Sequence, residues 1–173
     1  MNAATIQARV QAQLAAARRE DCFISALELS RLEARIEARL RTRDTQRCRV
    51  YAWENKLFER TSLDTPLSLA ECQRLVDRWA KSYGMAPIRV TGGRGCCWRH
   101  EDRTIRLGRL GRVPWVIAHE FAHARVTHDF SRGTVAAHGP EFVFRYLEVL
   151  TEQLDQDWAA LVDSLAAAGI DSE

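Results

Sequence analysis

The sequence predicts an α+β fold, in which helices precede and follow a small sheet. Before about residue 84 and again after residue 113, apolar residues recur every three or four positions, which is typical of amphipathic helices. Between these segments, residues 88–107 alternate apolar and polar side chains around glycine-containing turns, which indicates short strands. With 173 residues and 46% hydrophobic content, the chain is long enough to bury a substantial core.

The N-terminal part of the chain predicts a helical arm over residues 1–42, followed by a second domain over residues 43–173. Two apolar stripes with four-residue spacing run through the arm: Ile6, Val10 and Leu14, then Leu32, Ile36 and Leu40. We expect these stripes to pack on each other or, through self-association, on a second chain. Residues 42–49 are charged and are expected to connect the arm to the second domain.

The middle of the chain predicts one capped helix and two strands. Ser68 and Glu71 have the spacing of a capping box, so a helix should begin there and end near Gly84. Strands are expected at residues 88–90 and 104–107, with turns at 91–95 and 100–103. From its place in the chain, the segment Thr104–Gly108 is the candidate edge strand. A closing helix is expected over residues 155–168.

A metal-binding motif lies in the helix that follows Pro114. His119 and His123 are four residues apart, so both imidazoles fall on one face of a helix and can bind the same ion. Glu120 lies beside them and can act as a general base towards water. The spacing therefore predicts metal-assisted hydrolysis, and the nitrogen ligands favour Zn²⁺.

The third ligand is expected to be His138. It precedes Gly139-Pro140, and the proline predicts the first turn of a second helix with His138 at its start. Asp129 and Glu141 are the alternatives, because carboxylate oxygens also bind zinc. Asp129 would require a sharp turn at position 126, which is a valine and therefore disfavours positive φ.

The sequence His-Glu-Phe-Ala-His-Ala, followed by His-Gly-Pro-Glu-Phe and an apolar helix, resembles the SprT-like zinc metallopeptidases. It is still more similar to a group of actinobacterial and phage-borne metallohydrolases, whose beginning resembles the segment from Arg43 to Glu54. The resemblance implies a zincin-like core, zinc bound by His119, His123 and His138, and Glu120 as the general base. In families of this type, an edge strand beside the site aligns extended peptide substrates.

These observations predict a zinc-dependent metallopeptidase acting on a peptide or protein substrate. An electrophile should stabilise the oxyanion, and Tyr146, Arg145 and His128 are the candidates. The alternative is a zinc-containing binding or accessory protein with little or no catalytic activity, which could be associated with DNA.

The amino-acid composition indicates which partners and which cellular compartment to expect. Seven arginines between Arg89 and Arg112 could contact nucleic acid. The five cysteines form no Cys-x-x-Cys pair and are odd in number, which argues against a secreted disulfide framework and favours a cytoplasmic protein. No apolar run approaches the ~20 residues of a membrane span, so no membrane partner is expected.

Overall fold

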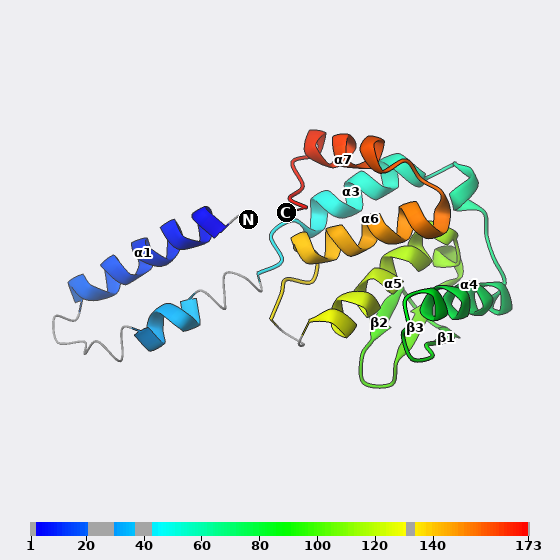
Figure 1. Cartoon of the computed structure of the whole chain (residues 1–173), viewed down its shortest axis with the longest axis horizontal. Coiled ribbons are helices and arrows are strands. Elements are labelled where there is room, and N and C mark those ends of the chain that lie inside the picture. The colour runs from blue at the N-terminus through cyan, green and yellow to red at the C-terminus, as the bar shows by residue number, and fades with distance from the viewer. Residues whose placement is uncertain (1–2, 21–29, 37–42, 131–133, 173) are drawn as a thin grey trace.

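The computed structural model describes residues 3–20, 30–36, 43–130 and 134–172. Helices surround a small three-stranded mixed sheet, so the predicted α+β class is confirmed. The elements are α1 (Ala3–Glu20), α3 (Arg47–Phe58), α4 (Leu69–Ser82), β1 (Arg89–Gly92), β2 (Cys97–Arg99), β3 (Thr104–Leu107), α5 (Pro114–Asp129), α6 (Pro140–Leu154) and α7 (Trp158–Ala167), with short 3-10 turns at Ser62–Asp64 and Arg109–Gly111. Figure 1 shows their arrangement.

The helix starts that the sequence predicts are present. The Ser68 hydroxyl accepts the Glu71 N–H at 3.2 Å, and the Glu71 carboxylate accepts the Ser68 N–H at 2.7 Å, which completes the capping box of α4. Gly84 follows this helix with φ +64°, a conformation that glycine adopts without strain. Pro114 and Pro140 lie in the first turns of α5 and α6.

The sheet has the order β1-β3-β2, so β3 is its central strand. The expectation that residues 104–108 form an edge strand is therefore wrong. β3 pairs with β1 in parallel and with β2 in the antiparallel sense, through the turn at residues 100–103. The outer side of β1 is occupied by Gln73 of α4, whose amide bonds to the Ile88 carbonyl at 2.8 Å and the Val90 N–H at 2.7 Å. Within the described part of the chain, β2 therefore pairs with β3 on one side and with no strand on the other.

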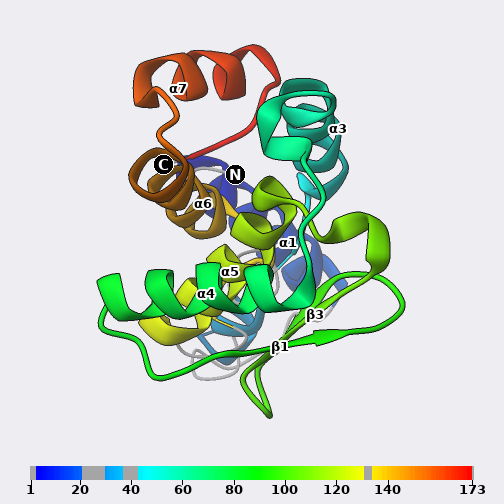
Figure 2. The ribbon, with the colours of Figure 1, turned by 90° about the vertical axis from the view of Figure 1, so that its right-hand side faces the viewer.

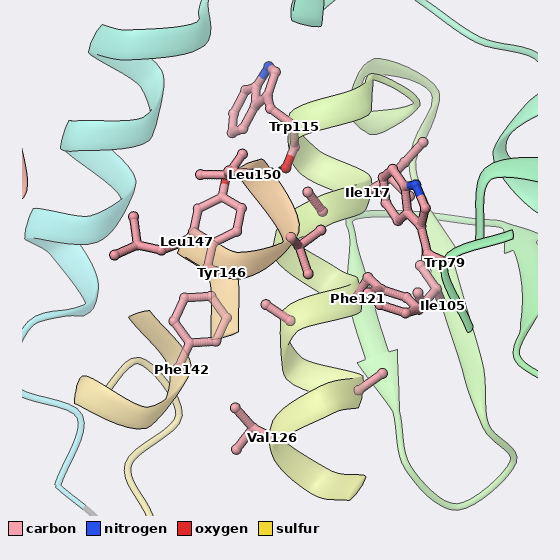
Figure 3. Close-up of a cluster of buried hydrophobic side chains, with 14 of the residues drawn as sticks. Trp79, Ile105, Trp115, Ile117, Phe121, Val126, Phe142, Tyr146, Leu147 and Leu150 are labelled. Atoms are coloured by element: carbon pink, nitrogen blue, oxygen red, sulfur yellow. Dashed lines mark hydrogen bonds between the residues drawn. The ribbon is translucent and has the colours of Figure 1, made fainter. Parts of the chain in front are cut away.

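Helix α5 runs through the centre of the hydrophobic core. On one side of it, Phe121 packs against Trp79 of α4, with ring centroids 5.6 Å apart, near Ile105 of β3. On the other side lie Tyr146 and Leu147 of α6, both about 1% exposed (Figure 3). Apolar elements thus cover two sides of α5, and His119, Glu120 and His123 of the predicted motif lie together along the same helix.

Helix α3 is an element that the sequence analysis did not predict. It begins at Arg47, inside the segment expected to be a connection. Trp53 anchors it, because its ring meets that of Tyr146 on α6 at 6.0 Å and its indole N–H donates to the Ser164 hydroxyl at 2.8 Å. Figure 2 shows α3, α6 and α7 grouped on the side of α5 away from the sheet. Helix α3 thus lies next to the motif, although the two are far apart in the sequence.

The N-terminal helices form a separate hydrophobic cluster. Val10 and Leu14 of α1 are 1% and 5% exposed, and they pack with Ile6 and with Leu32 and Ile36 of the helical residues 30–36. Leu40 and the expected boundary at residue 42 lie outside the described residues. Among those residues, no helix is both long and apolar enough to cross a membrane.

Candidate metal centre

Three histidines meet at one point in the structure. His119 and His123 lie on adjacent turns of α5, and His138 directly precedes the first residues of α6. Each offers one ring nitrogen, and these three atoms all lie within 4.8 Å of one another. His119 and His138 are each 4% exposed, so the group is shielded from bulk solvent. The three histidines could therefore hold a metal ion.

A single aromatic ring supports all three imidazoles. The centroid of Phe142 lies 4.9 Å from that of His119, 4.4 Å from that of His123 and 4.9 Å from that of His138. Phe142 itself is fully buried in the first turn of α6. Gly139 allows the chain to bring His138 close, since a Cβ at that position would lie 3.0 Å from the Cβ of Ala136. The sequence His-Gly-Pro-Glu-Phe thus specifies both the ligand and its support.

Two carboxylates contact the Nδ1 atoms of two of the histidines and orient their rings. The Nδ1 atom of His119 lies 2.8 Å from Glu54 Oε2, and the Nδ1 atom of His138 lies 2.8 Å from Asp44 Oδ2. A carboxylate at Nδ1 favours the tautomer that carries its proton there, which leaves the Nε2 lone pair free to bind a metal. No sequence motif assigned a role to Glu54 or Asp44.

The spacing of the free nitrogens suits a metal ion. The Nε2 atoms of His119 and His138 are 3.3 Å apart. Two nitrogen ligands at the usual zinc distance, about 2.0–2.1 Å in tetrahedral geometry, are separated by about 3.3–3.4 Å. Two lone pairs facing each other at this distance repel unless a cation or a proton lies between them. The three nitrogen donors, and the spacing of the His119–His138 pair, therefore fit a tetrahedral metal.

Burial sets the charges of the centre. It lowers the pKa of His119 to about 3, and the charge of His138 contributes in the same direction. Burial and the two neighbouring histidines also hold the pKa of His123 well below its ordinary value. Neutral imidazoles are the form that binds a metal, so no proton has to leave these two ligands at neutral pH.

Glu120 lies beside the histidines and is 6% exposed. Burial raises its pKa to about 7, although its carboxylate accepts the backbone N–H of Trp98, which acts in the opposite direction. A carboxyl group with a pKa near neutrality can both accept and donate a proton at physiological pH. This hydrogen bond also ties the motif helix to strand β2.

The site opens into a cleft of about 580 Å³. One wall carries polar side chains from residues 44–51, together with Glu120, His123 and His138. Strand β2 supplies a second wall through Cys97 and Trp98, and the indole of Trp98 is held by the Thr127 hydroxyl at 3.0 Å. Val126, Phe130, Val135 and Ala136 form the apolar part of the lining.

The alternative ligands have other partners. Asp129 forms an ion pair with Arg145, with Oδ2 2.7 Å from Nε, and its Oδ1 lies 3.0 Å from His128 Nδ1, because α5 continues as a helix past position 126. Among the residues the structure describes, the one group spaced to hold a metal contains His119, His123 and His138 and neither Asp129 nor Glu141.

The three oxyanion candidates from the sequence do not line the cleft. Tyr146 is buried, with its hydroxyl 3.2 Å from the Trp115 carbonyl oxygen and within hydrogen-bonding reach of Glu54. Arg145 is paired with Asp129 and Glu148. Tyr51 of α3, which was not among the predicted candidates, lines the cleft instead.

Some of the arginines between residues 89 and 112 stabilise the sheet. Arg89 and Arg99 lie 3.8 Å and 3.4 Å from Asp102 Oδ2. Arg103 donates to the carbonyl oxygens of Ala86 and Pro87. These contacts give three of the seven arginines a local structural role.

Comparison with protein-family models, with curated proteins and with solved structures gave no match to this chain.

Proposed function

We propose that this chain is a zinc-dependent metallopeptidase with a zincin-like core. The observation that carries the proposal is the meeting of three imidazoles and the Glu120 carboxyl group at one cleft. His119, His123 and His138 would hold the zinc ion, with a fourth position left for water or substrate. Three nitrogen ligands, neutral imidazoles and carboxylates behind two of them are the features of a catalytic zinc site.

The reaction proposed is hydrolysis of a peptide bond. When bound, zinc supplies Lewis-acid polarisation and makes water more acidic. Glu120 takes a proton from the attacking water and then delivers it to the leaving amine. The Trp98 N–H keeps the Glu120 carboxylate oriented towards the cleft during both transfers.

Strand β2 is the proposed docking edge for an extended substrate. In an antiparallel pair, the N–H and C=O of one residue face the same side of the strand. Since the Trp98 N–H bonds Glu120, the Trp98 carbonyl faces the cleft side as well. A peptide lying along β2 would donate a main-chain N–H to this carbonyl, which gives affinity without demanding a particular sequence.

The first test compares four purified proteins: the wild type, His138→Ala, Glu120→Gln and His128→Ala. His128→Ala is the matched control, because it removes an exposed histidine from α5, the helix that carries Glu120. We expect about one zinc per chain in the wild type, Glu120→Gln and His128→Ala, and loss of zinc from His138→Ala.

Activity is measured on the same four proteins with casein and with a mixture of quenched fluorogenic peptides. Turnover is expected in the wild type and in His128→Ala only. A Glu120→Gln protein that cleaves peptides at the wild-type rate would contradict the assigned base. A zinc-loaded wild type that cleaves neither substrate would contradict peptidase activity and favour the binding-protein alternative.

A further inference from the structure

We propose that Tyr51, supported by Arg47, is the catalytic residue that stabilises the oxyanion of the reaction. This inference rests on the proposed function and adds an electrophile that the metal-binding motif does not contain. It comes from one face of α3. Arg47, Tyr51 and Glu54 are spaced four and three residues apart, so they lie in one row along the helix. Glu54 bonds a metal ligand, and the other two line the cleft.

The position of Tyr51 is fixed by the ligands themselves. Its ring centroid lies 5.5 Å from that of His119 and 5.1 Å from that of His138, the latter in an edge-on arrangement. It is half-buried and shares the cleft with Glu120. Among the described residues that line the cleft, it supplies the phenolic hydroxyl; the other tyrosines, Tyr83 and Tyr146, are not part of the lining.

Arg47 makes the Tyr51 hydroxyl a better donor. The guanidinium carbon lies 5.5 Å from the ring centroid, and the side chain donates a hydrogen bond to the phenol oxygen. A positive donor on the oxygen draws electron density from the O–H bond, so the phenol proton is given more strongly to a new acceptor. Tyr51 shares the cleft with Glu120, so the donor and the proposed general base face the same substrate position.

The chemical step is balanced without a change in the state of Tyr51. Water attacks the carbonyl carbon, a C–O bond forms, and the carbonyl π-electrons move to oxygen while Glu120 takes the proton from water. Tyr51 donates its O–H to the resulting oxyanion, where a preorganised donor lowers the barrier. When the C–N bond breaks, the electron pair returns to form the carbonyl and Glu120 gives its proton to nitrogen. Tyr51 retains its proton throughout.

The arrangement also explains why α3 belongs to the site. Helix α3 orients the metal ligand His119 through Glu54 and also carries Tyr51, the proposed oxyanion donor. One rigid element would therefore position both the ligand and the donor. Arg47 and Tyr51 could instead bind a substrate carboxylate, which would make the protein selective for free peptide C-termini. The test separates these two roles.

The experiment uses the full chain loaded with zinc and three variants: Tyr51→Phe, Arg47→Gln and the matched control Tyr83→Phe. Tyr51→Phe keeps the ring against the histidines and removes only the hydroxyl, so its zinc content should equal that of the wild type. We expect kcat to fall by about 10²-fold with KM nearly unchanged, the size of effect seen when one oxyanion donor is removed. Arg47→Gln should lower kcat less, and Tyr83→Phe should leave it unchanged.

A second readout is independent of turnover. A phosphinic dipeptide analogue, whose anionic oxygens stand in for the oxyanion, is titrated calorimetrically into each zinc-loaded protein. It should bind Tyr51→Phe at least tenfold more weakly than the wild type. If no protein in the set cleaves peptides, the proposed function fails, but this titration still decides the role of Tyr51.

Three results would overturn the proposal. One is a Tyr51→Phe protein with wild-type kcat and wild-type affinity for the phosphinic analogue. Another is loss of zinc from Tyr51→Phe, which would make the residue a support for the ligands. The third is an effect of Arg47→Gln and Tyr51→Phe on KM that disappears when the peptide C-terminus is amidated, which would assign both side chains to a substrate carboxylate.

Discussion

Glu54 Oε2 lies 2.8 Å from His119 Nδ1, although the two residues are 65 positions apart in the chain. Both side chains are about 5% exposed, so solvent competes little for this contact. Burial raises the pKa of Glu54 to about 8, because a charged carboxylate is disfavoured away from water. The pair is therefore arranged for an environment in which a positive ion offsets the carboxylate.

Replacing Glu54 with Gln should weaken metal binding while preserving the fold. The amide can still accept the His119 Nδ1–H, but it lacks the charge that makes the opposite nitrogen a stronger ligand. We expect the zinc dissociation constant to rise about 10- to 100-fold, as for other carboxylates behind metal-bound histidines. Competition with a chromogenic chelator measures it. Glu59→Gln, which alters an exposed carboxylate just beyond the same helix, is the control, and equal affinities in the two variants would contradict this role.

Asp44 should act in the same way on His138, with a smaller effect. Its Oδ2 atom lies 2.8 Å from His138 Nδ1, but its side chain is 24% exposed, so water can replace part of the interaction. Asp44→Asn is expected to raise the zinc dissociation constant by about tenfold, at the lower end of the usual range. The exposed Asp163→Asn of α7 is the control. A larger loss of zinc affinity in Asp44→Asn than in Glu54→Gln would show that the exposure of the carboxylate does not determine how much each contact contributes.

The local parts of the site were predictable, and the contacts between distant elements were not. His119 and His123 follow from helical spacing, and His138 from the proline that begins α6, because both signals lie within a few residues. The row on α3 was missed because Arg47, Tyr51 and Glu54 occupy positions where an amphipathic helix usually carries apolar residues. Their partners are supplied by α5 and by residues before α6, which no local pattern reveals.

The strand order shows the same limit. Alternation predicts strands at residues 88–90 and 104–107, where the structure has β1 (Arg89–Gly92) and β3 (Thr104–Leu107), and it contains no information on which strand is central. In the sheet, β3 lies between β1 and β2, although both of these strands precede it in the chain. The edge near the metal centre consequently belongs to β2, and the Trp98 N–H that reaches Glu120 is a result of that order.

Gly111 should tolerate no larger residue while Cys96 is present. A Cβ at position 111 would lie 2.1 Å from the Cys96 Sγ atom, although Gly111 has no positive φ that would require glycine. Gly111→Ala is expected to destabilise the protein by about 1–3 kcal/mol through overpacking. In a Cys96→Ala background the nearest Cys96 atom is Cβ at 3.7 Å, so most of this cost should disappear.

Urea unfolding of the wild type, both single variants and the double variant measures this coupling as a double-mutant cycle. An equal cost of Gly111→Ala in the two backgrounds would show that the clash with Cys96 is not the cause. Because Cys96 also lines the cleft, the zinc content of each protein should be determined in parallel.

The capping box of α4 predicts a specific pH dependence of stability. Hydrogen bonds from the hydroxyl and backbone N–H of Ser68 hold the pKa of Glu71 below its ordinary value of 4.5. A carboxyl group with a lowered pKa in the folded state stabilises the protein above its unfolded-state pKa, and this contribution is lost as the pH falls through the folded-state value. Glu71→Gln keeps an acceptor for the Ser68 N–H but carries no charge. The wild type should therefore melt at a higher temperature than Glu71→Gln at pH 7, and the difference should shrink below about pH 4.5 and vanish once Glu71 is protonated in both states.

Asp163→Asn, which removes an exposed carboxylate outside any capping box, is the control. A difference between the wild type and Glu71→Gln that stays constant from pH 7 to pH 3 would mean that the geometry of the side chain, and not its charge, stabilises the start of α4.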